Sequence, residues 1–374
     1  MRTLKTPLTG FWPSYPLEKL APLDEILFLD IETTGFAAIS SSLYMIGCAY
    51  YEDGGFHLIQ WFAAKKEDEQ ELLHAFFKFA SKHRLLIHFN GNTFDLPYLQ
   101  KKCEQYGLSY GFDSFEGIDL YKRILPYKEL LNLPDCKQRT LEDFLGLHRE
   151  DPFQGGELIA VYKKYISSPT DIAFQALMQH NADDIKGMLS LLPLLTYNDL
   201  FTAPLKVKKA QANYYQDSQG ERKKELILNC RLSSPLPSPV SCHHMDCYMS
   251  AEGTAVSLRI PIYEEEMKYF YSNYRDYYYL PTEDTALHKS VAAFVDKAHR
   301  EKATASNCYT RKFSSYLPQW EVLFTPFFKR EYASDELFFE LTEDLKSNRN
   351  AFTLYTTHIM QMLLRNRTKK DHKD

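Results

Sequence analysis

Two acidic residues near the N-terminus have the spacing of a metal-binding pair. Asp30 and Glu32 stand in the run DIETTG (30–35), directly after the apolar segment 26–29. In an extended segment, side chains two residues apart share one face, so both carboxylates should point together at a strand end. Crowded carboxylates repel one another, and a divalent cation with hard oxygen ligands would resolve that conflict. The simpler alternative is two solvated acids at the end of a strand.

Further candidate residues lie in two later segments. Asp95 follows the apolar run 85–89 and an NGN turn, where a helix is expected to begin. On its own, such an aspartate is most simply interpreted as a helix N-cap. His180 and Asp184 are four residues apart in the run HNADD (180–184), so they should share one face of a helix. On its own, this is most simply a surface pair.

Taken together, the three segments resemble the DEDD superfamily of 3′–5′ exonucleases. The shared order is Asp-x-Glu, a lone Asp after a strand, and a ring-bearing side chain four residues before a final Asp. Segments 118–121, 137–146 and 156–165 also resemble a bacterial group of predicted stand-alone ribonuclease-H-like exonucleases, so the resemblance spans about residues 24–197. It implies a metal-dependent nuclease that hydrolyses phosphodiester bonds of DNA or RNA.

The resemblance assigns roles residue by residue. In that family, four acids hold two divalent ions, Mg²⁺ or Mn²⁺, which activate a water and stabilise the leaving 3′ oxygen. The corresponding ligands here are Asp30, Glu32, Asp95 and Asp184. Three polar neighbours are the expected substrate contacts: Thr33, Asn90 and Asn92.

His180 departs from the pattern of the superfamily. One branch places Tyr four residues before the last Asp, and the other places His five residues before it, whereas this chain has His at the tyrosine spacing. We interpret His180 as a catalytic residue that orients or deprotonates water, because imidazole titrates near neutral pH. Asp183 remains an alternative to Asp184 as the ligand. A catalytically weak or silent nucleic-acid-binding module, and an endonuclease on the same fold, are the alternative functions.

The elements that must position these residues follow from hydrophobic periodicity and turn residues. The run EDGG (52–55) predicts a hairpin between two strands. The order of strands and helices predicts an α/β fold, a ribonuclease-H-like mixed sheet flanked by helices. The expected strands are 26–30, 43–51, 56–62 and 85–89, and the expected helices are 67–82, 95–106, 140–146, 156–166 and an unbroken 171–197.

The second half of the chain differs from the first in composition. Basic segments and a proline-serine stretch after Tyr197 place a boundary near residue 200, so residues 1–200 form the exonuclease-like domain and 201–374 an α+β accessory domain of unknown function. Eight aromatic residues in 263–279 either stack single-stranded bases or pack in a core. The expected strands are 225–232, 244–249 and 254–262, and the expected helices are 283–303 and 351–365.

Composition excludes several classes of protein. The 374 residues are 44% hydrophobic and 25% charged, which excludes wholesale disorder, and no apolar run is long enough to span a membrane. Seven scattered cysteines favour free thiols and a cytoplasmic location over a disulfide framework, and Cys242 to Cys247 lacks the second ligand pair of a zinc finger. The net charge of −5 permits nucleic-acid binding through a local patch. Single-stranded DNA or RNA is the expected partner, and a protein partner of the accessory domain stays open.

Overall fold

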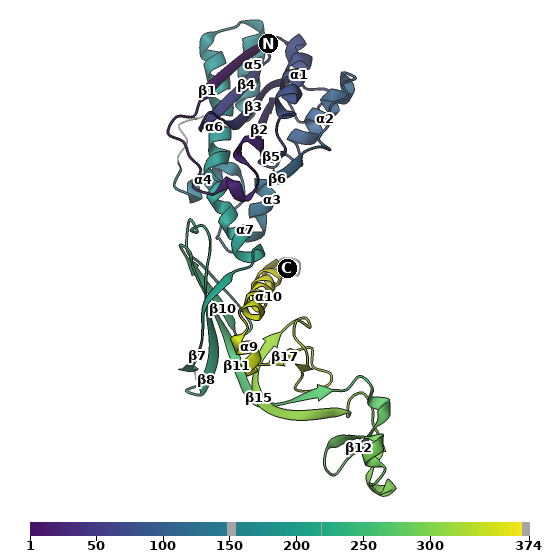
Figure 1. Cartoon of the computed structure of the whole chain (residues 1–374). Helices are drawn as coiled ribbons and strands as arrows, with labels where there is room; N and C mark the ends of the chain where they lie inside the picture. Colours follow the sequence, from purple (N-terminus) through teal and green to yellow (C-terminus); the bar gives the residue numbers. More distant parts are fainter. Residues whose placement is uncertain (148–154, 218, 369–374) are drawn as a thin grey trace. The chain divides into compact units, whose positions relative to one another are not determined.

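The computed structural model describes residues 1–147, 155–217 and 219–368 (Figure 1). The chain divides into two compact units. The N-terminal unit comprises Met1–Asn198 and Ser234–Pro237, and the C-terminal unit comprises Asp199–Ser233 and Ser238–Asp374. Among the described residues, no helix is both long enough and apolar enough to cross a membrane.

A six-stranded mixed sheet forms the centre of the N-terminal unit, in the order β1-β4-β3-β2-β5-β6. The first four strands in this order pair antiparallel, while β5 and β6 continue the sheet in parallel with β2. The strands are β1 (Arg2–Pro7), β2 (Ile26–Thr33), β3 (Leu43–Glu52), β4 (Gly55–Phe62), β5 (Leu85–His88) and β6 (Glu116–Asp119).

Helices flank this sheet, which confirms the predicted α/β fold. Helix α6 contacts β2 and β3, while α1 contacts β3 and β4 (Figure 1). The predicted hairpin is also confirmed, because Asp53 and Gly54 take positive φ angles of 51° and 84° between β3 and β4. The helices are α1 (Glu69–Ala80), α2 (Asp95–Gln105), α3 (Leu120–Ile124), α4 (Gln138–Phe144), α5 (Gly155–Ser167), α6 (Asp171–Ser190) and α7 (Leu195–Thr202).

The prediction of one unbroken helix over 171–197 is wrong. Helix α6 ends at Ser190, and a 3₁₀ turn over Leu192–Leu194 separates it from α7. Pro193 lies in this turn, and proline has no N–H to donate to the preceding turn of an α-helix, which explains the interruption. The segment that carries His180 and Asp184 precedes the break and is helical.

The C-terminal unit is β-rich. An eight-stranded sheet contains the path β16-β17-β15-β11-β10-β9, with β8 paired to β11 and β7 at the edge beyond β8. A separate three-stranded sheet has the order β13-β12-β14. The strands of the C-terminal unit are β7 (Lys206–Gln216), β8 (Arg222–Arg231), β9 (Val240–His244), β10 (Cys247–Glu252), β11 (Ala255–Phe270), β12 (Tyr277–Leu280), β13 (Thr285–His288), β14 (Glu301–Lys302), β15 (Tyr309–Gln319), β16 (Phe327–Phe328) and β17 (Leu337–Glu340).

Two predictions for this unit are wrong in detail. The expected helix 283–303 contains β13, a short helix α8 (Lys289–Ala292) and β14, because both strands pair with β12 and this pairing overrides the local period. The expected strand 244–249 is instead interrupted by a turn, where Met245 has a φ of 49°. The helical end is confirmed as α10 (Arg349–Thr368), which follows the short α9 (Glu343–Ser347).

Candidate metal-binding and catalytic site

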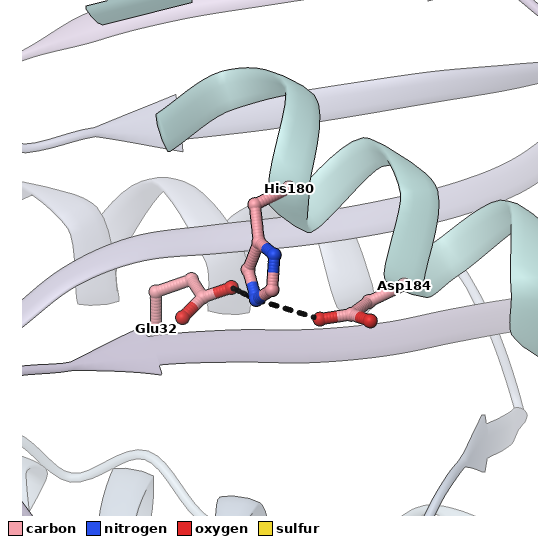
Figure 2. Close-up of side chains that lie close together, drawn as sticks. All are labelled: Glu32, His180 and Asp184. Carbon is pink, nitrogen blue, oxygen red and sulfur yellow. Dashed lines mark ion pairs between the residues drawn. The ribbon is translucent and has the colours of Figure 1, made fainter. Parts of the chain in front are cut away.

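Glu32, His180 and Asp184 lie together at the end of strand β2. Figure 2 shows the imidazole of His180 lying between the two carboxylates. His180 Nε2 is 3.3 Å from Asp184 Oδ2 and 3.8 Å from Glu32 Oε1. One ligand atom from each residue lies within 4.8 Å of the others. Residues 152 positions apart in the sequence, on β2 and α6, therefore form one potential site for a metal ion.

Asp30 is held by a side chain of α6. The Nδ2 group of Asn181 donates to Asp30 Oδ2 at 2.8 Å. Gln60 of β4 in turn donates from Nε2 to Asn181 Oδ1 at 2.9 Å and to the carbonyl of Met178 at 2.9 Å. The amide of Asn181 is therefore fixed with its nitrogen toward Asp30, because its oxygen already accepts from Gln60. Both amide side chains are buried.

A glycine allows this helix to approach the sheet. Gly47 of β3 lies between Asp30 and Gln60 in the strand register. A Cβ atom at this position would come within 2.0 Å of Asn181 Oδ1 and 2.6 Å of Ile185 Cδ1. Any larger residue would therefore force α6 away from the sheet and break the hydrogen bond from Asn181 to Asp30.

Asp95 begins helix α2, after the turn that follows β5. Its side chain is buried, and backbone N–H groups of Ile31 and Asp95 itself hydrogen-bond to it. Asp119, at the end of β6, holds the turn in place by accepting from the backbone N–H groups of Asn90 at 2.9 Å and Asn92 at 3.3 Å. Asp119 also caps α3, because its side chain accepts from the backbone N–H of Lys122.

Burial and mutual repulsion raise the pKa values of three carboxylates. Loss of hydration is the largest cause for each of them. The pKa of Asp30 is raised further by Asp184, Glu32 and Asp95. The pKa of Glu32 rises to about 8, although the neighbouring His180 opposes the shift, and that of Asp95 rises to about 7. The cluster is therefore short of positive charge at neutral pH.

A divalent cation fits this donor set. Carboxylate oxygens are the ligands that Mg²⁺ and Mn²⁺ prefer, and imidazole nitrogen is acceptable to Mn²⁺. A cation would also offset the repulsion that raises the pKa values of Asp30, Glu32 and Asp95. The residues that could hold such ions are the four acids of the cluster, with His180 beside them.

The two neighbouring aspartates of α6 have different surroundings. Asp184 faces His180, whereas Asp183 accepts from Gln179 Nε2 at 2.6 Å and lies 3.7 Å from Lys186 Nζ. Asp183 thus belongs to a set of contacts along its own helix, outside the Glu32 group. This arrangement favours Asp184 as the ligand.

The three expected substrate contacts lie near the cluster but make local hydrogen bonds. Thr33 ends β2, and its Oγ1 donates to the carbonyl of Gly35 at 2.9 Å. Asn90 has a φ of 58° and is half-buried, while the side chain of Asn92 is exposed. Both asparagines contact Asp119 through their backbone N–H groups.

Sequence analysis missed Asn181 and Gln60, which hold Asp30 in place. The sequence gives no signal for their contact, because the two residues are 121 positions apart and bear no charge. Phe36 follows the DIETTG run, is 91% exposed, and lies edge-on to Phe94 with ring centroids 5.9 Å apart.

One comparison with known proteins agrees with this arrangement. Residues 27–196 match the family model of the RNase_H superfamily. This RNase_H-like region contains the whole cluster, from Asp30 on β2 to Asp184 on α6. The match supports a nuclease-type function, and ribonuclease-H-like nucleases use divalent metal ions.

Two further searches give less. No curated protein matches the chain significantly. Among solved structures, the family B DNA polymerase from the hyperthermophilic archaeon Pyrobaculum calidifontis is similar, with a TM-score of 0.36 and 11% sequence identity. The similarity covers 67% of this chain but only 35% of the polymerase chain.

Proposed function

We propose that this protein is a metal-dependent 3′–5′ exonuclease acting on single-stranded DNA or RNA. One observation carries the proposal: Asp30, Glu32, Asp95 and Asp184 converge from three separate elements, β2, α2 and α6, and lie close enough for Asp184 to raise the pKa values of the other three. The match of residues 27–196 to the RNase_H superfamily supports the same class of chemistry.

The four carboxylates would hold two divalent ions, Mg²⁺ or Mn²⁺. Bound ions of this kind supply a nucleophilic hydroxide and offset the charge that develops on the leaving 3′ oxygen. The protein's own contribution is to fix the ligands. Asn181 leaves one oxygen of Asp30 for metal binding by hydrogen-bonding to the other.

His180 would act on the attacking water. Its Nε2 lies 3.3 Å from Asp184, on the face of α6 that is directed toward the ligands. A neutral imidazole at this position can orient a water molecule or accept its proton, provided that the ring is held in place. The contacts of the ring with Glu32 and Asp184 provide that support.

The terminal nucleotide would bind beside the acidic cluster. Phe36 offers an exposed ring on which a base can stack, and base–aromatic stacking tolerates any sequence. Thr33, Asn90 and Asn92 supply hydroxyl and amide groups nearby that can contact sugar or phosphate. A 3′-end specificity requires that a longer strand not continue past this site.

Degradation of end-labelled strands tests this function. Pure protein would be incubated with 3′- and 5′-labelled single strands of DNA and RNA, with Mg²⁺, Mn²⁺ or EDTA. A 5′-labelled strand should shorten in single-nucleotide steps, whereas a 3′-labelled strand should release labelled mononucleotide at once. Internal cuts would indicate an endonuclease on the same fold. Intact strands under every metal condition would support the non-catalytic binding module instead.

A further inference from the structure

One side of the eight-stranded sheet is covered by helix α10. The buried residues of the strands on this side are apolar, for example Leu228 of β8 and Leu258 of β11. Helix α10 presents buried Tyr355 and Ile359 and contacts β7 and β9. This side of the sheet faces the core of the unit. Along β9, β10 and β11, residues that face the core alternate with residues that face solvent on the second side.

The second side carries polar residues in register across five strands. Cross-strand partners lie on the same side of a sheet, so the pairing places these residues in rows. One row runs across β7, β8, β11, β10 and β9 as Lys209, Asn229, Ser257, Ser250 and Ser241. A hollow of about 430 Å³ is lined by the last four of these residues.

The adjacent row adds a cation and a ring. It runs as Gln211, Ile227, Arg259, Tyr248 and His243. The ring of Tyr248 is 41% exposed, and its register partner His243 is exposed as well. We call these two rows, together with Arg231, the open face.

The charges of the open face favour an anionic partner. Lys209, Arg231 and Arg259 are exposed, and within the described part of the chain none of the three has an ion-pair partner. Of the acids on the same side, Glu225 is 7% exposed and accepts from Asn213 Nδ2 at 2.7 Å. Glu252 is the exposed acid of this face: it lines the hollow and shares a row with Arg231, against which it offsets one of the three cations. The face is therefore locally basic in a chain whose net charge is −5.

We infer that the open face binds single-stranded nucleic acid. The cations would contact phosphates, Tyr248 would stack on a base, and the serine and asparagine hydroxyl and amide groups would donate to sugar and phosphate oxygens. Five strands span about 19 Å at about 4.8 Å per interstrand step, enough to hold several nucleotides of an extended strand. The inference rests on the proposed function in one respect, because a nuclease that holds long strands needs a site of this chemistry in addition to its catalytic centre.

Binding in EDTA tests the face without cleavage. Full-length protein would be titrated into fluorescein-labelled oligo-dT and oligo-U of about 20 nucleotides over a series of salt concentrations. A triple variant, Lys209→Gln, Arg231→Gln and Arg259→Gln, should bind more weakly, and the slope of log affinity against log salt should fall by about 2, since each phosphate contact to a single strand contributes about 0.7.

Variants of Tyr248 test stacking separately from charge. Tyr248→Ala should weaken binding by about 5- to 100-fold with an unchanged salt slope, while Tyr248→Phe should keep wild-type affinity because the ring is retained. Lys297→Gln, an exposed lysine outside the eight-stranded sheet, is the matched control and should bind like wild type. Circular dichroism would verify that each variant is folded.

The outcomes separate this inference from the proposed function. Wild-type affinity and salt slope in the triple variant and in Tyr248→Ala would overturn the open face as a nucleic-acid site, even if the protein hydrolyses strands normally. Conversely, a wild-type protein that binds strands through the face in EDTA, but hydrolyses none with Mg²⁺ or Mn²⁺, would contradict the exonuclease and leave the face established. If Lys297→Gln weakened oligonucleotide binding as much as the changes on the open face, the loss would come from net charge alone, and the open face would not be the binding site.

Discussion

The two large sheets of this chain differ in where they place their charged residues: one buries acids, and the other exposes cations. The sheet of the N-terminal unit is covered by helices, and its acids gather at the end of β2, where Glu32 is 9% exposed. The sheet of the C-terminal unit is covered on one side only, and the other side carries exposed cations without ion-pair partners in the described ranges. Charges that repel while buried need a bound counter-ion, whereas exposed charges already have water. The first arrangement suits a metal centre, and the second suits a reversible contact with a polyanion.

The largest expected effect comes from removing one buried charge. Asp30→Asn should abolish hydrolysis and weaken Mn²⁺ binding in isothermal titration calorimetry, because one ligand charge that offsets the cations is lost. Asp183→Asn is the matched control, since Asp183 contacts Gln179 and Lys186 instead of the cluster. Full activity of Asp30→Asn, or undiminished wild-type activity in EDTA, would contradict the metal-dependent site. Loss of metal binding in Asp183→Asn would instead reassign the ligand on α6.

His180 should affect the rate without removing the metals. His180→Ala should lower the turnover number by about 10²–10⁴-fold, the usual contribution of a general base, while Mn²⁺ affinity stays close to wild type. His180→Tyr should retain part of the activity, because a hydroxyl group can still orient water. A large loss of Mn²⁺ affinity in His180→Ala would show that the imidazole is a ligand.

The Asn181 contact should have a smaller effect. Asn181→Ala removes the hydrogen bond to Asp30 and should weaken Mn²⁺ affinity by about 10–100-fold, as is typical for residues that orient metal ligands. Gln60→Ala acts on the same contact and should add little when combined with Asn181→Ala, because residues in one hydrogen-bond network are not independent. Calorimetric titration of the two single variants and the double variant measures this. Fully additive losses would contradict a shared role.

These residues also mark the limit of what the sequence predicts. Asp30, Glu32, His180 and Asp184 could be proposed because charge and short spacing are visible in a sequence. The hairpin at Asp53 and Gly54 was predictable because its turn residues are local. Contacts such as Gln60 to Asn181 were not, since they depend on which strand α6 crosses.

The second unit adds a different limit. A strand over 254–262 was predictable, but the row of Asn229, Ser257, Ser250 and Ser241 exists only through strand register. Register is set by pairing across the sheet, which single-sequence periodicity does not contain. The same pairing explains why 283–303 was misread as a helix.

The smallest expected effect is a pH-dependent stability. The pKa values of Glu32 and Asp95 in the folded protein, about 8 and about 7, lie above the ordinary values of 4.5 and 3.8. The folded state therefore binds protons more tightly than the unfolded state, so protonation of these acids stabilises the fold. This stabilisation is complete below about pH 4 and is lost as the pH rises toward 7–8. In EDTA the Tm of the protein should therefore fall across that window, since each unit by which a pKa is raised corresponds to about 1.4 kcal/mol of folding free energy.

Variants separate this effect from general pH sensitivity. Glu32→Gln has no charge to expel, so its Tm in EDTA should exceed that of wild type at about pH 8, and the difference should shrink as the pH falls. Glu252→Gln, at the exposed end of β10, is the control from the other sheet and should follow the wild-type curve, because an exposed carboxylate is hydrated in both states. Differential scanning fluorimetry across the pH range measures all three. If Glu32→Gln and Glu252→Gln give the same curve of Tm against pH, the buried carboxylates of the N-terminal sheet do not destabilise the fold by their charge. The proposed contrast between the buried acids of one sheet and the exposed charges of the other would then be wrong.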